Sequence, residues 1–566
     1  MKTKLKHIGL SRLTAAIALT GAIASAQPAD TIYTGGSIIS VNDAAPSAEA
    51  LAVKDGKILA VGSKADVLKL KGDDTKLVDL GGKALLPGFL DAHSHFNNAL
   101  QIVGWANVSS PPVGPVTDIP SLVATLKAHA AKMRPKKGEW IIAYGYDANG
   151  LAEKREATVL DLDPAFPDNP VMLIHVSNHG AVLNSAALAK EGVTEKTQTP
   201  AGGVIARLPG GHKPAGLLME TAFFPIFAKM PQPTEEEKLA SFKTAQMEYA
   251  RNGYTTVQEG ATQYGDFLTI QKAAEKKLLF LDLVALPIVT ELKAFDGVDF
   301  TDTAYHNRLK LGGVKLIGDG SPQGKTAYWS KPLLTDGPGG EKNWRGEPMV
   351  PYETFAKMVK AMDEKGARIY VHCNGDGAID NLLKALDEIG VKASQDRRVV
   401  VIHSQFVRPD QLDRYVELGI TPSFFTSHVF FWGDVHVRNT GEERAAFISP
   451  MAAAKARGIH FSNHTDFSVT PLDPFMTIWS ATTRLTRSGK VLGADQRVDV
   501  MTALKALTLD AAWQYKEEKS KGSLEPGKLA DLVILDKNPL TVDPMTIKDI
   551  KVVETIKEGK TVYGAN

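Results

Sequence analysis

One stretch of sequence decides the fold: Leu85-Leu86-Pro87-Gly88-Phe89-Leu90-Asp91-Ala92-His93-Ser94-His95. Its apolar residues predict a buried strand that ends in a His-x-His pair. Side chains alternate along a strand, so His93 and His95 point to the same side and can share one metal ion. In parallel α/β barrels the active site lies at the carboxyl ends of the strands. This position favours metal ligation over a chance pair or a turn.

Apolar segments alternate with helical stretches through most of the chain, which predicts a parallel α/β sheet. The strand candidates are Ala84–Asp91, Thr255–Glu259, Phe280–Pro287, Gly313–Gly318, Ala367–His372, Val399–His403, Ile420–Ser423 and Ile459–Asp466. Eight strands suit a (β/α)₈ TIM-type barrel. More than 150 residues separate the first two candidates, so we expect an inserted subdomain after barrel strand 1, at about 97–234.

Both ends of the chain show a different pattern. Residues 30–79 and 530–563 contain short β-branched stretches of period two, punctuated by Gly and Asp, which predicts antiparallel strands. Neither end has enough strands for a two-layer core, so we expect them to pair in one small β-sandwich. The expected domains are residues 27–84 and 521–566 for the sandwich and 85–520 for the barrel with its insert.

Residues 1–26 resemble a secretory signal peptide. Lysines at 2, 4 and 6 and Arg12 precede an apolar run from Leu13 to Ala24, and Ala24-Ser25-Ala26 is a small-residue cleavage site. The apolar run is shorter than the ~20 residues that cross a bilayer, although a membrane anchor is the alternative. We therefore expect a protein exported to the periplasm, with no membrane span after processing.

The composition limits the partners and the metal ligands. Lys plus Arg (65) and Asp plus Glu (64) leave a net charge of +1, so no overall field attracts nucleic acid. We expect a small-molecule substrate instead. Because Cys373 is the single cysteine, a metal site has to use histidine, carboxylate or modified lysine.

Three more strand candidates end in groups that can bind metal. They supply His372, His403, and the pair His464 and Asp466. Each histidine alone is as readily a packing residue, and Asp466 alone could cap a turn. Their recurrence at successive strand ends favours a metal site. His464 shares its face with Asp466, and we expect it to contact a ligand or the substrate.

Lys315 is a charge inside the apolar segment Gly313–Gly318, where an unpaired ammonium is costly. Carboxylation by carbon dioxide would turn it into an anion able to bridge two metal ions. The alternative is an ordinary lysine paired with Asp319, four residues on. Glu259, at the end of the second strand candidate, is a rival bridging carboxylate.

These motifs resemble the amidohydrolase superfamily, and within it the amidohydrolase-3 branch that includes N-substituted formamide deformylase-like proteins. The resemblance rests on the His-x-His start, on Val314-Lys315-Leu316-Ile317-Gly318-Asp319-Gly320-Ser321, on His372 to Ile379 and on Asp466. Segments Ser177–Ser185 and Gly522–Val533 extend it over the mature chain. The resemblance implies a barrel with a terminal sandwich, one or two divalent metal ions, with zinc expected, and hydrolysis of an amide-type C–N bond.

The resemblance also implies a role for each residue. His93 and His95 would hold one metal, His372 and His403 the second, and Lys315 would bridge them. Asp466 would move the proton of the attacking water. The sequence departs from the family pattern at two positions that would tune the metal. Ile402 precedes His403 where an acidic residue is common, and Glu259 stands where Asp is common.

The expected reaction is hydrolysis of an N-acyl or N-formyl amide by metal-activated water. Alternatives are a carbamate, a cyclic amide or an ester on the same metal centre, or a binding or regulatory protein without turnover. Tyr328-Trp329, Phe424-Phe425 and Phe430-Phe431-Trp432 predict an apolar or aromatic substrate, with Trp329 as a substrate contact, although all could be core. His179 is a second expected substrate contact, with a packed or surface histidine as the alternative.

Overall fold

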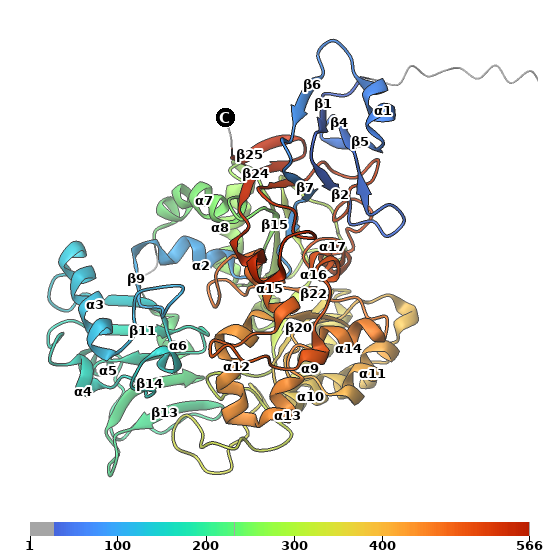
Figure 1. Ribbon diagram of the computed structural model, residues 1–566. Helices are drawn as coiled ribbons and strands as arrows, with labels where there is room; N and C mark the ends of the chain where they lie inside the picture. Colours follow the sequence, from blue (N-terminus) through green and yellow to red (C-terminus); the bar gives the residue numbers. More distant parts are fainter. Residues whose placement is uncertain (1–27, 231–232, 565–566) are drawn as a thin grey trace, which may run out of the picture.

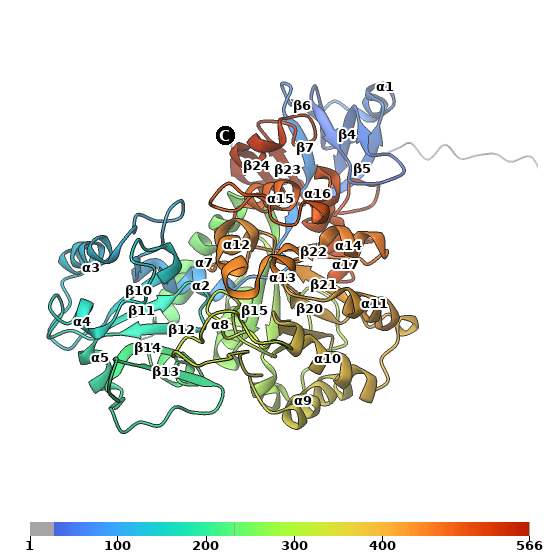
Figure 2. The same ribbon diagram turned by 60° about the horizontal axis from the view of Figure 1, so that its bottom comes forward.

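The computed structural model describes residues 28–230 and 233–564. The signal peptide expected at residues 1–26 lies outside them. Figure 1 shows three regions: the two chain ends together at one side, a sheet of early residues at another, and an α/β core between them. The turned view in Figure 2 keeps the same grouping. None of the helices within the described ranges has both the length and the apolar character needed to cross a membrane.

The core is an α/β fold of TIM-barrel type. Its parallel strands form two sheets with the orders β17-β16-β15-β8 and β18-β19-β20-β21-β22. The strands are β8 (Phe89–Leu90), β15 (Tyr254–Thr262), β16 (Asp282–Pro287), β17 (Leu309–Leu311), β18 (Val314–Ile317), β19 (Ile369–Cys373), β20 (Val400–His403), β21 (Thr421–Phe424) and β22 (Ser462–Asn463).

The two sheets are linked at both edges. At one edge the N–H of Gly312 donates to the carbonyl of Ala285 at 3.0 Å, and Ile288 forms a parallel bridge with Lys315. At the other edge the N–H of Asp466 donates to the carbonyl of His93 at 3.1 Å. The two sheets therefore contact each other at both edges, through these strands or the residues directly after them.

Glycines mark two breaks between strands: Gly312 lies just before the predicted strand Gly313–Gly318, and Gly88 lies inside the predicted strand Ala84–Asp91. A Cβ on Gly312 would lie 2.4 Å from Cγ1 of Val284, so the backbone between β17 and β18 needs glycine for its close approach to β16. A Cβ on Gly88 would likewise lie 2.4 Å from Cγ2 of Thr255. The predicted strand Ala84–Asp91 is accordingly two strands, β7 (Ala84–Pro87) and β8, in different sheets.

Helices cover the core strands (Figure 1). A buried apolar cluster fills the space between the helices and the strands. Helix α11 shows how local sequence sets the bounds: it begins at Pro409, which suits a first helical position, and ends before Gly419, whose φ is 66°. The covering helices are α8 (Tyr264–Glu275), α9 (Tyr352–Glu364), α10 (Asp376–Glu388), α11 (Pro409–Leu418), α12 (Ser427–Thr440), α15 (Pro474–Thr483), α16 (Val500–Ala506) and α17 (Leu509–Gln514).

The chain ends contribute to one six-stranded sheet, ordered β25-β24-β23-β7-β2-β3, beside a four-stranded sheet, β5-β4-β1-β6. Leu51 and Val53 of the second sheet share a buried cluster with Leu85, Leu532 and Ile556 of the first. The strands are β1 (Thr31–Thr34), β2 (Ser37–Ile39), β3 (Ser47–Ala48), β4 (Ala50–Lys54), β5 (Lys57–Gly62), β6 (Lys76–Asp79), β23 (Leu532–Leu535), β24 (Val552–Lys557) and β25 (Lys560–Gly564).

A third region lies between β8 and β15 in sequence, within the expected insert. Its six-stranded sheet has the order β13-β14-β12-β11-β10-β9, with a separate apolar cluster on each face. Its elements are β9 (Ala106–Asn107), α3 (Ile119–Met133), β10 (Ile141–Tyr146), α4 (Val159–Leu162), β11 (Val171–His175), β12 (Gly180–Leu183), α5 (Ser185–Lys190), β13 (Gly203–Arg207), β14 (Pro214–Glu220) and α6 (Phe224–Phe227). Helices α2 (Phe96–Gln101) and α7 (Glu235–Ala250) flank this region in sequence and pack in the core cluster.

A buried ion-pair network joins the core to the C-terminal sheet. Asp282, at the start of β16, lies 2.8 Å from the ammonium of Lys521 and 2.6 Å from that of Lys557. Lys557 also contacts Asp531 at 2.7 Å. Burial alone would raise the pKa of Asp282, but the two lysines outweigh it and hold that pKa below its usual range. The carboxylate is therefore ionised in the folded protein at neutral pH.

We predict that Asp282→Asn lowers the free energy of unfolding by about 3–5 kcal/mol at pH 7, because it leaves two buried ammonium groups short of a partner. Asp282 contributes its full stabilisation above the unfolded-state pKa of about 4, and this contribution is lost as pH falls from there toward the lower pKa that Asp282 has in the folded protein. Urea unfolding followed by tryptophan fluorescence, at pH 7 and at about pH 2, measures both effects.

Asp296→Asn is the matched control, since Asp296 pairs with Lys365 while 66% exposed. We expect it to change the free energy by less than about 1 kcal/mol. Equal effects of the two substitutions would contradict a stabilising role for the buried network.

Candidate metal centre

His93 and His95 follow β8 and open the site. His93 is fully buried, and its Nδ1 lies 2.7 Å from Oε1 of Gln258 in β15. The amide nitrogen of Gln258 donates to the carbonyl of Ala92 at 3.0 Å, so Oε1 is the acceptor and Nδ1 of His93 carries the proton. This fixes the tautomer that leaves Nε2 of His93 free to bind a metal.

Asp466 brings a carboxylate to the two histidines. Its Oδ1 lies 3.4 Å from Nε2 of His95 and 3.6 Å from Nε2 of His93, and its Oδ2 lies 3.9 Å from Nε2 of His403. Backbone φ values of 50° at Asp466 and 71° at His403 are left-handed. Such strained residues cluster at active sites.

The chemistry of this group fits a divalent metal ion. Ligand atoms of His93, His95 and Asp466 all lie within 4.8 Å of one another, and Oδ1 of Asp466 is buried without a hydrogen bond of good geometry. Zinc binds His nitrogen and carboxylate oxygen at about 2.0–2.2 Å, so atoms 3.4 and 3.6 Å apart can share one ion. A buried oxygen left unpaired among histidines is what a cation would satisfy.

The protonation states follow from burial and charge. Burial holds the pKa of His93 and of His403 well below the usual histidine range, so both rings are neutral. Burial also lowers the pKa of His95, but Asp466 and Glu259 outweigh it and raise that pKa to about 9. The centre therefore attracts positive charge at the position of His95 and Asp466.

His372 and His403 stand at the ends of the adjacent strands β19 and β20, with ring centroids 4.5 Å apart. Nδ1 of His372 lies 3.1 Å from Oδ1 of Asp319, and Nδ1 of His403 lies 3.0 Å from Nε2 of His464. Ser423 holds the other nitrogen of His464 at 2.9 Å. The contact that we expected His464 to make with a ligand is therefore with His403.

Lys315 on β18 reaches the same centre. Its Nζ is 3.3 Å from Nε2 of His93, and burial lowers the pKa of Lys315 to about 8. Asp319 instead accepts hydrogen bonds from the backbone N–H groups of Asn374 and Gly375, at 2.9 and 2.7 Å. Its carboxylate thus anchors the loop after β19, and no ion pair joins Lys315 to Asp319 in the described structure.

Glu259 lies beside the centre on β15. Its Oε2 accepts the N–H of Asn97 at 2.6 Å, and its Oε1 lies 3.7 Å from Nδ1 of His95. Glu259 therefore holds the start of α2 and touches His95 from the side away from Asp466.

The two expected substrate contacts differ in placement. His179 lines the cavity above the centre, and its Nδ1 lies 2.9 Å from Oε2 of Glu220. Trp329 contradicts our prediction, since it is 1% exposed and lines no part of this cavity. Its ring packs against Phe406, with centroids 4.5 Å apart, in a cluster beneath the loops. The sequence pattern could not separate this packing role from a binding role.

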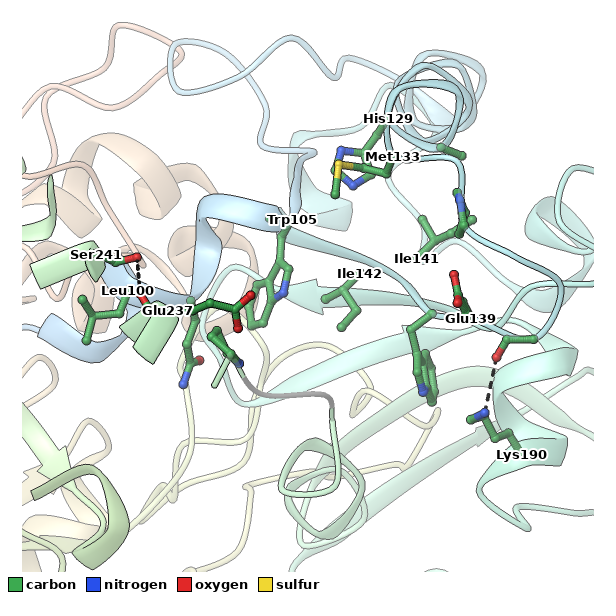
Figure 3. A pocket seen from close by; sticks show the side chains of 17 residues that line it. Leu100, Trp105, His129, Met133, Glu139, Ile141, Ile142, Lys190, Glu237 and Ser241 are labelled. Carbon is green, nitrogen blue, oxygen red and sulfur yellow. Dashed lines mark hydrogen bonds between the residues drawn. The ribbon is translucent and has the colours of Figure 1, made fainter. Parts of the chain in front are cut away.

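A cavity of about 440 Å³ opens onto the centre. The insert supplies apolar side chains that the sequence analysis did not identify, among them Trp105, Phe224 and Phe227. Trp105 also lines a second cavity of about 660 Å³, where His129 and Met133 of α3 lie across from it (Figure 3). The indole of Trp105 thus forms the wall between the two.

Comparison with known proteins shows which proteins this chain resembles. Residues 76–563 match the model of the amidohydrolase family. The protein LONG AFTER FAR-RED 3 of Arabidopsis thaliana is 30% identical over 94% of this chain and 92% of its own. The N-substituted formamide deformylase of Arthrobacter pascens is 26% identical over 91% of this chain and 95% of its own. A solved metal-dependent hydrolase of Pyrococcus horikoshii OT3 has the same fold, with a TM-score of 0.70, 24% identity, and coverage of 91% of this chain and 99% of that one.

We predict that Asp319→Asn lowers metal affinity by about 10–100-fold, because groups that orient a ligating histidine have effects of this size. The neutral amide gives His372 a weaker partner while nearly keeping the shape. Competition with a chelator of known affinity, followed by metal analysis, measures the change. Asp380→Asn, which alters an α10 carboxylate paired with Arg408, is the control. Unchanged affinity in Asp319→Asn would rule out this orienting role.

Proposed function

The chain belongs to the amidohydrolase family. On this premise we propose that it hydrolyses a non-peptide C–N bond, that of an N-acyl or N-formyl amide. The observation that carries the proposal is the convergence of His93, His95 and Asp466, with ligand atoms within 4.8 Å, beside a cavity of about 440 Å³. The similarity to a protein named N-substituted formamide deformylase supports the proposal of amides as substrates.

Two sets of side chains would hold metal. His93 and His95, with Asp466, form the first set, and His372 and His403 form the second. We propose zinc for at least the first set, because its nitrogen and oxygen donors suit that ion. A bound divalent ion supplies activated water at neutral pH and polarises the scissile carbonyl.

Asp466 moves the proton in this proposal. Burial would raise the pKa of Asp466, but the imidazole of His95, 3.4 Å away, and the other nearby histidines hold that pKa well below its usual range. The carboxylate is thus ionised and can accept the proton of the attacking water. It then delivers that proton to the nitrogen as the C–N bond breaks, so that a carboxylic acid and an amine leave.

His179 positions the substrate from the insert. Burial lowers the pKa of His179, but the Glu220 carboxylate outweighs this and raises it above the usual value. A protonated imidazole facing the cavity can donate a hydrogen bond to the substrate carbonyl oxygen. Glu220 keeps the ring oriented for that contact.

Lys315 is carboxylated in the working enzyme, in this proposal. Its neutral amine adds to carbon dioxide, forming a nitrogen–carbon bond and releasing one proton, and the product is an anion. Two observations support this: Nζ lies 3.3 Å from Nε2 of His93, and Lys315 is 2% exposed and forms no ion pair within the described residues. An anion between two cations would offset their repulsion.

The domain division and the destination of the protein complete the proposal. Residues 27–84 and 521–566 form the terminal sandwich, 85–520 form a closed (β/α)₈ barrel in which β17 and β18 count as one strand, and about 97–234 form its insert. Residues 1–26 direct export to the periplasm. Mass spectrometry of the protein purified from the periplasm tests the export. We expect Gln27 as its first residue.

We predict that removing divalent metal with a chelator abolishes amide hydrolysis and that zinc restores it. Asp466→Asn should keep its metal, held by histidines, and lose about 10²–10⁴-fold in kcat, since it cannot accept a proton. Metal analysis together with kcat over a panel of N-acyl and N-formyl amides measures both. Full turnover by demonstrably metal-free protein would refute the metal-dependent mechanism. A normal kcat in Asp466→Asn, with chemistry rate-limiting, would reassign the proton transfer.

A second prediction concerns Lys315. A high-resolution crystal structure of the metal-loaded protein should show planar density beyond Nζ that reaches the metal. Lys315→Ala should lose activity, and short carboxylates such as acetate should restore part of it by taking the same position. Lys310→Ala, which alters a buried lysine paired with Glu517, should show no such rescue. Unmodified Lys315 with Glu259 bound to metal would transfer the bridging role to Glu259.

A further inference from the structure

The metal centre lies where two cavities of very different size meet. The large cavity, of about 440 Å³, and a small one, of about 10 Å³, share His179, His372, His403 and Asp466 as lining residues. A bond cleaved at this centre therefore has one substituent on each side. The size and chemistry of the two cavities then decide which substituents fit.

The small cavity is lined by polar side chains that the proposed mechanism does not use. We call it the polar niche, formed by Ser321, Gln323, Asn374, Gln405 and His428. All five are at most 3% exposed. Four of them carry a buried oxygen without a hydrogen-bond partner, namely Ser321 Oγ, Gln323 Oε1, Asn374 Oδ1 and Gln405 Oε1.

These unpaired oxygens point to a ligand. A buried polar atom without a partner costs about 1–3 kcal/mol, and native structures hold few of them. The side-chain nitrogen of Asn374 donates to the carbonyl of Gly320 at 3.0 Å, which identifies the unpaired atom of Asn374 as its oxygen. Residues that line this one small space thus hold four unpaired oxygens, and a group that donates hydrogen bonds would satisfy them.

The niche limits that group to a very small one. A space of about 10 Å³ has room for roughly one water-sized group. The large cavity is far more spacious and has apolar walls. We call it the apolar chamber, and its walls include Trp105, Phe224, Phe227, Met349 and Met358.

We propose that the polar niche is a specificity site for a compact hydrogen-bonding end of the substrate, while the apolar chamber takes a bulky apolar group. This inference rests on the proposed C–N hydrolysis. The substrate class is thus an asymmetric amide, with a carbamoyl or formamido end of a few heavy atoms on an apolar body. Gln323 and Gln405 are the residues that select the compact end.

Three amides test the asymmetry. Phenylacetamide and N-benzylformamide are isomers that place the compact end on the nitrogen or on the carbonyl side, and N-benzylphenylacetamide is bulky on both sides. We expect at least one isomer to have a kcat/KM about 100-fold or more above that of the doubly bulky amide. The preferred isomer tells which half of the amide occupies the niche.

Variants then connect the preference to the niche. Gln323→Met and Gln405→Met keep side-chain length and remove the hydrogen-bonding oxygen. Each should lower kcat/KM for the preferred isomer, and so reduce its preference over the doubly bulky amide about tenfold. Metal content measured on each variant must equal that of the wild type, since a changed centre would slow all amides alike. Gln198→Met, at an exposed position of the insert, is the matched control and should change nothing.

The outcomes separate this inference from the proposed function. Comparable rates on all three amides, or a preference untouched by both niche variants, would mean that the niche holds solvent only, and would overturn the inference. Hydrolysis of carbamates or cyclic amides but of neither isomer would also overturn it and leave C–N hydrolysis standing. Failure of the metal-loaded protein on every C–N substrate would remove the proposed function and the inference with it.

Discussion

The backbone contact between the first and last core strands is the constraint on which the site depends. The N–H of Asp466 donates to the carbonyl of His93, and the N–H of His95 donates to the carbonyl of Phe467 at 2.9 Å. These bonds place a carboxylate from late in the chain beside two histidines from early in it. The left-handed backbone at Asp466 turns its side chain toward them. Lys315, His372 and His403 lie on core strands β18, β19 and β20, which come between the first and the last core strand along the chain.

The sequence predicted the parts of the site that local pattern encodes. The His-x-His at the end of an apolar segment, and His372 and His403 at later strand ends, follow from strand periodicity. Gln258 and Asp319, which orient the histidines, were not assigned that role, because their partners lie on other strands and no spacing in the chain marks them. Trp329 was misplaced since an aromatic residue after a strand suits a cavity wall and a buried cluster equally. The break at Gly312 depends on contact with Val284, which only the folded sheet creates.

Chemistry and selection come from different parts of the chain. The core strands supply the histidines, Lys315 and Asp466, all held by short hydrogen bonds or by burial. The insert supplies Trp105, Phe224, Phe227 and His179, which surround the space where a substrate would lie. Loops that vary on a rigid scaffold are a common route to new specificity. None of the proposed metal ligands lies in the insert.

The pairing of β7 with β23 has a consequence for how the protein is made. β7 leads through Gly88 directly into β8 and the first two histidines, yet β23 leaves the ribosome roughly 450 residues later. At ~5–20 residues per second, translation of that interval takes tens of seconds. During this time β7, which leads into the strand before the histidines, lacks one of its neighbours, and its apolar residues are exposed to non-native contacts. A nonsense mutation near the end of the gene, although far from every catalytic residue in sequence, would therefore leave the metal site without its support.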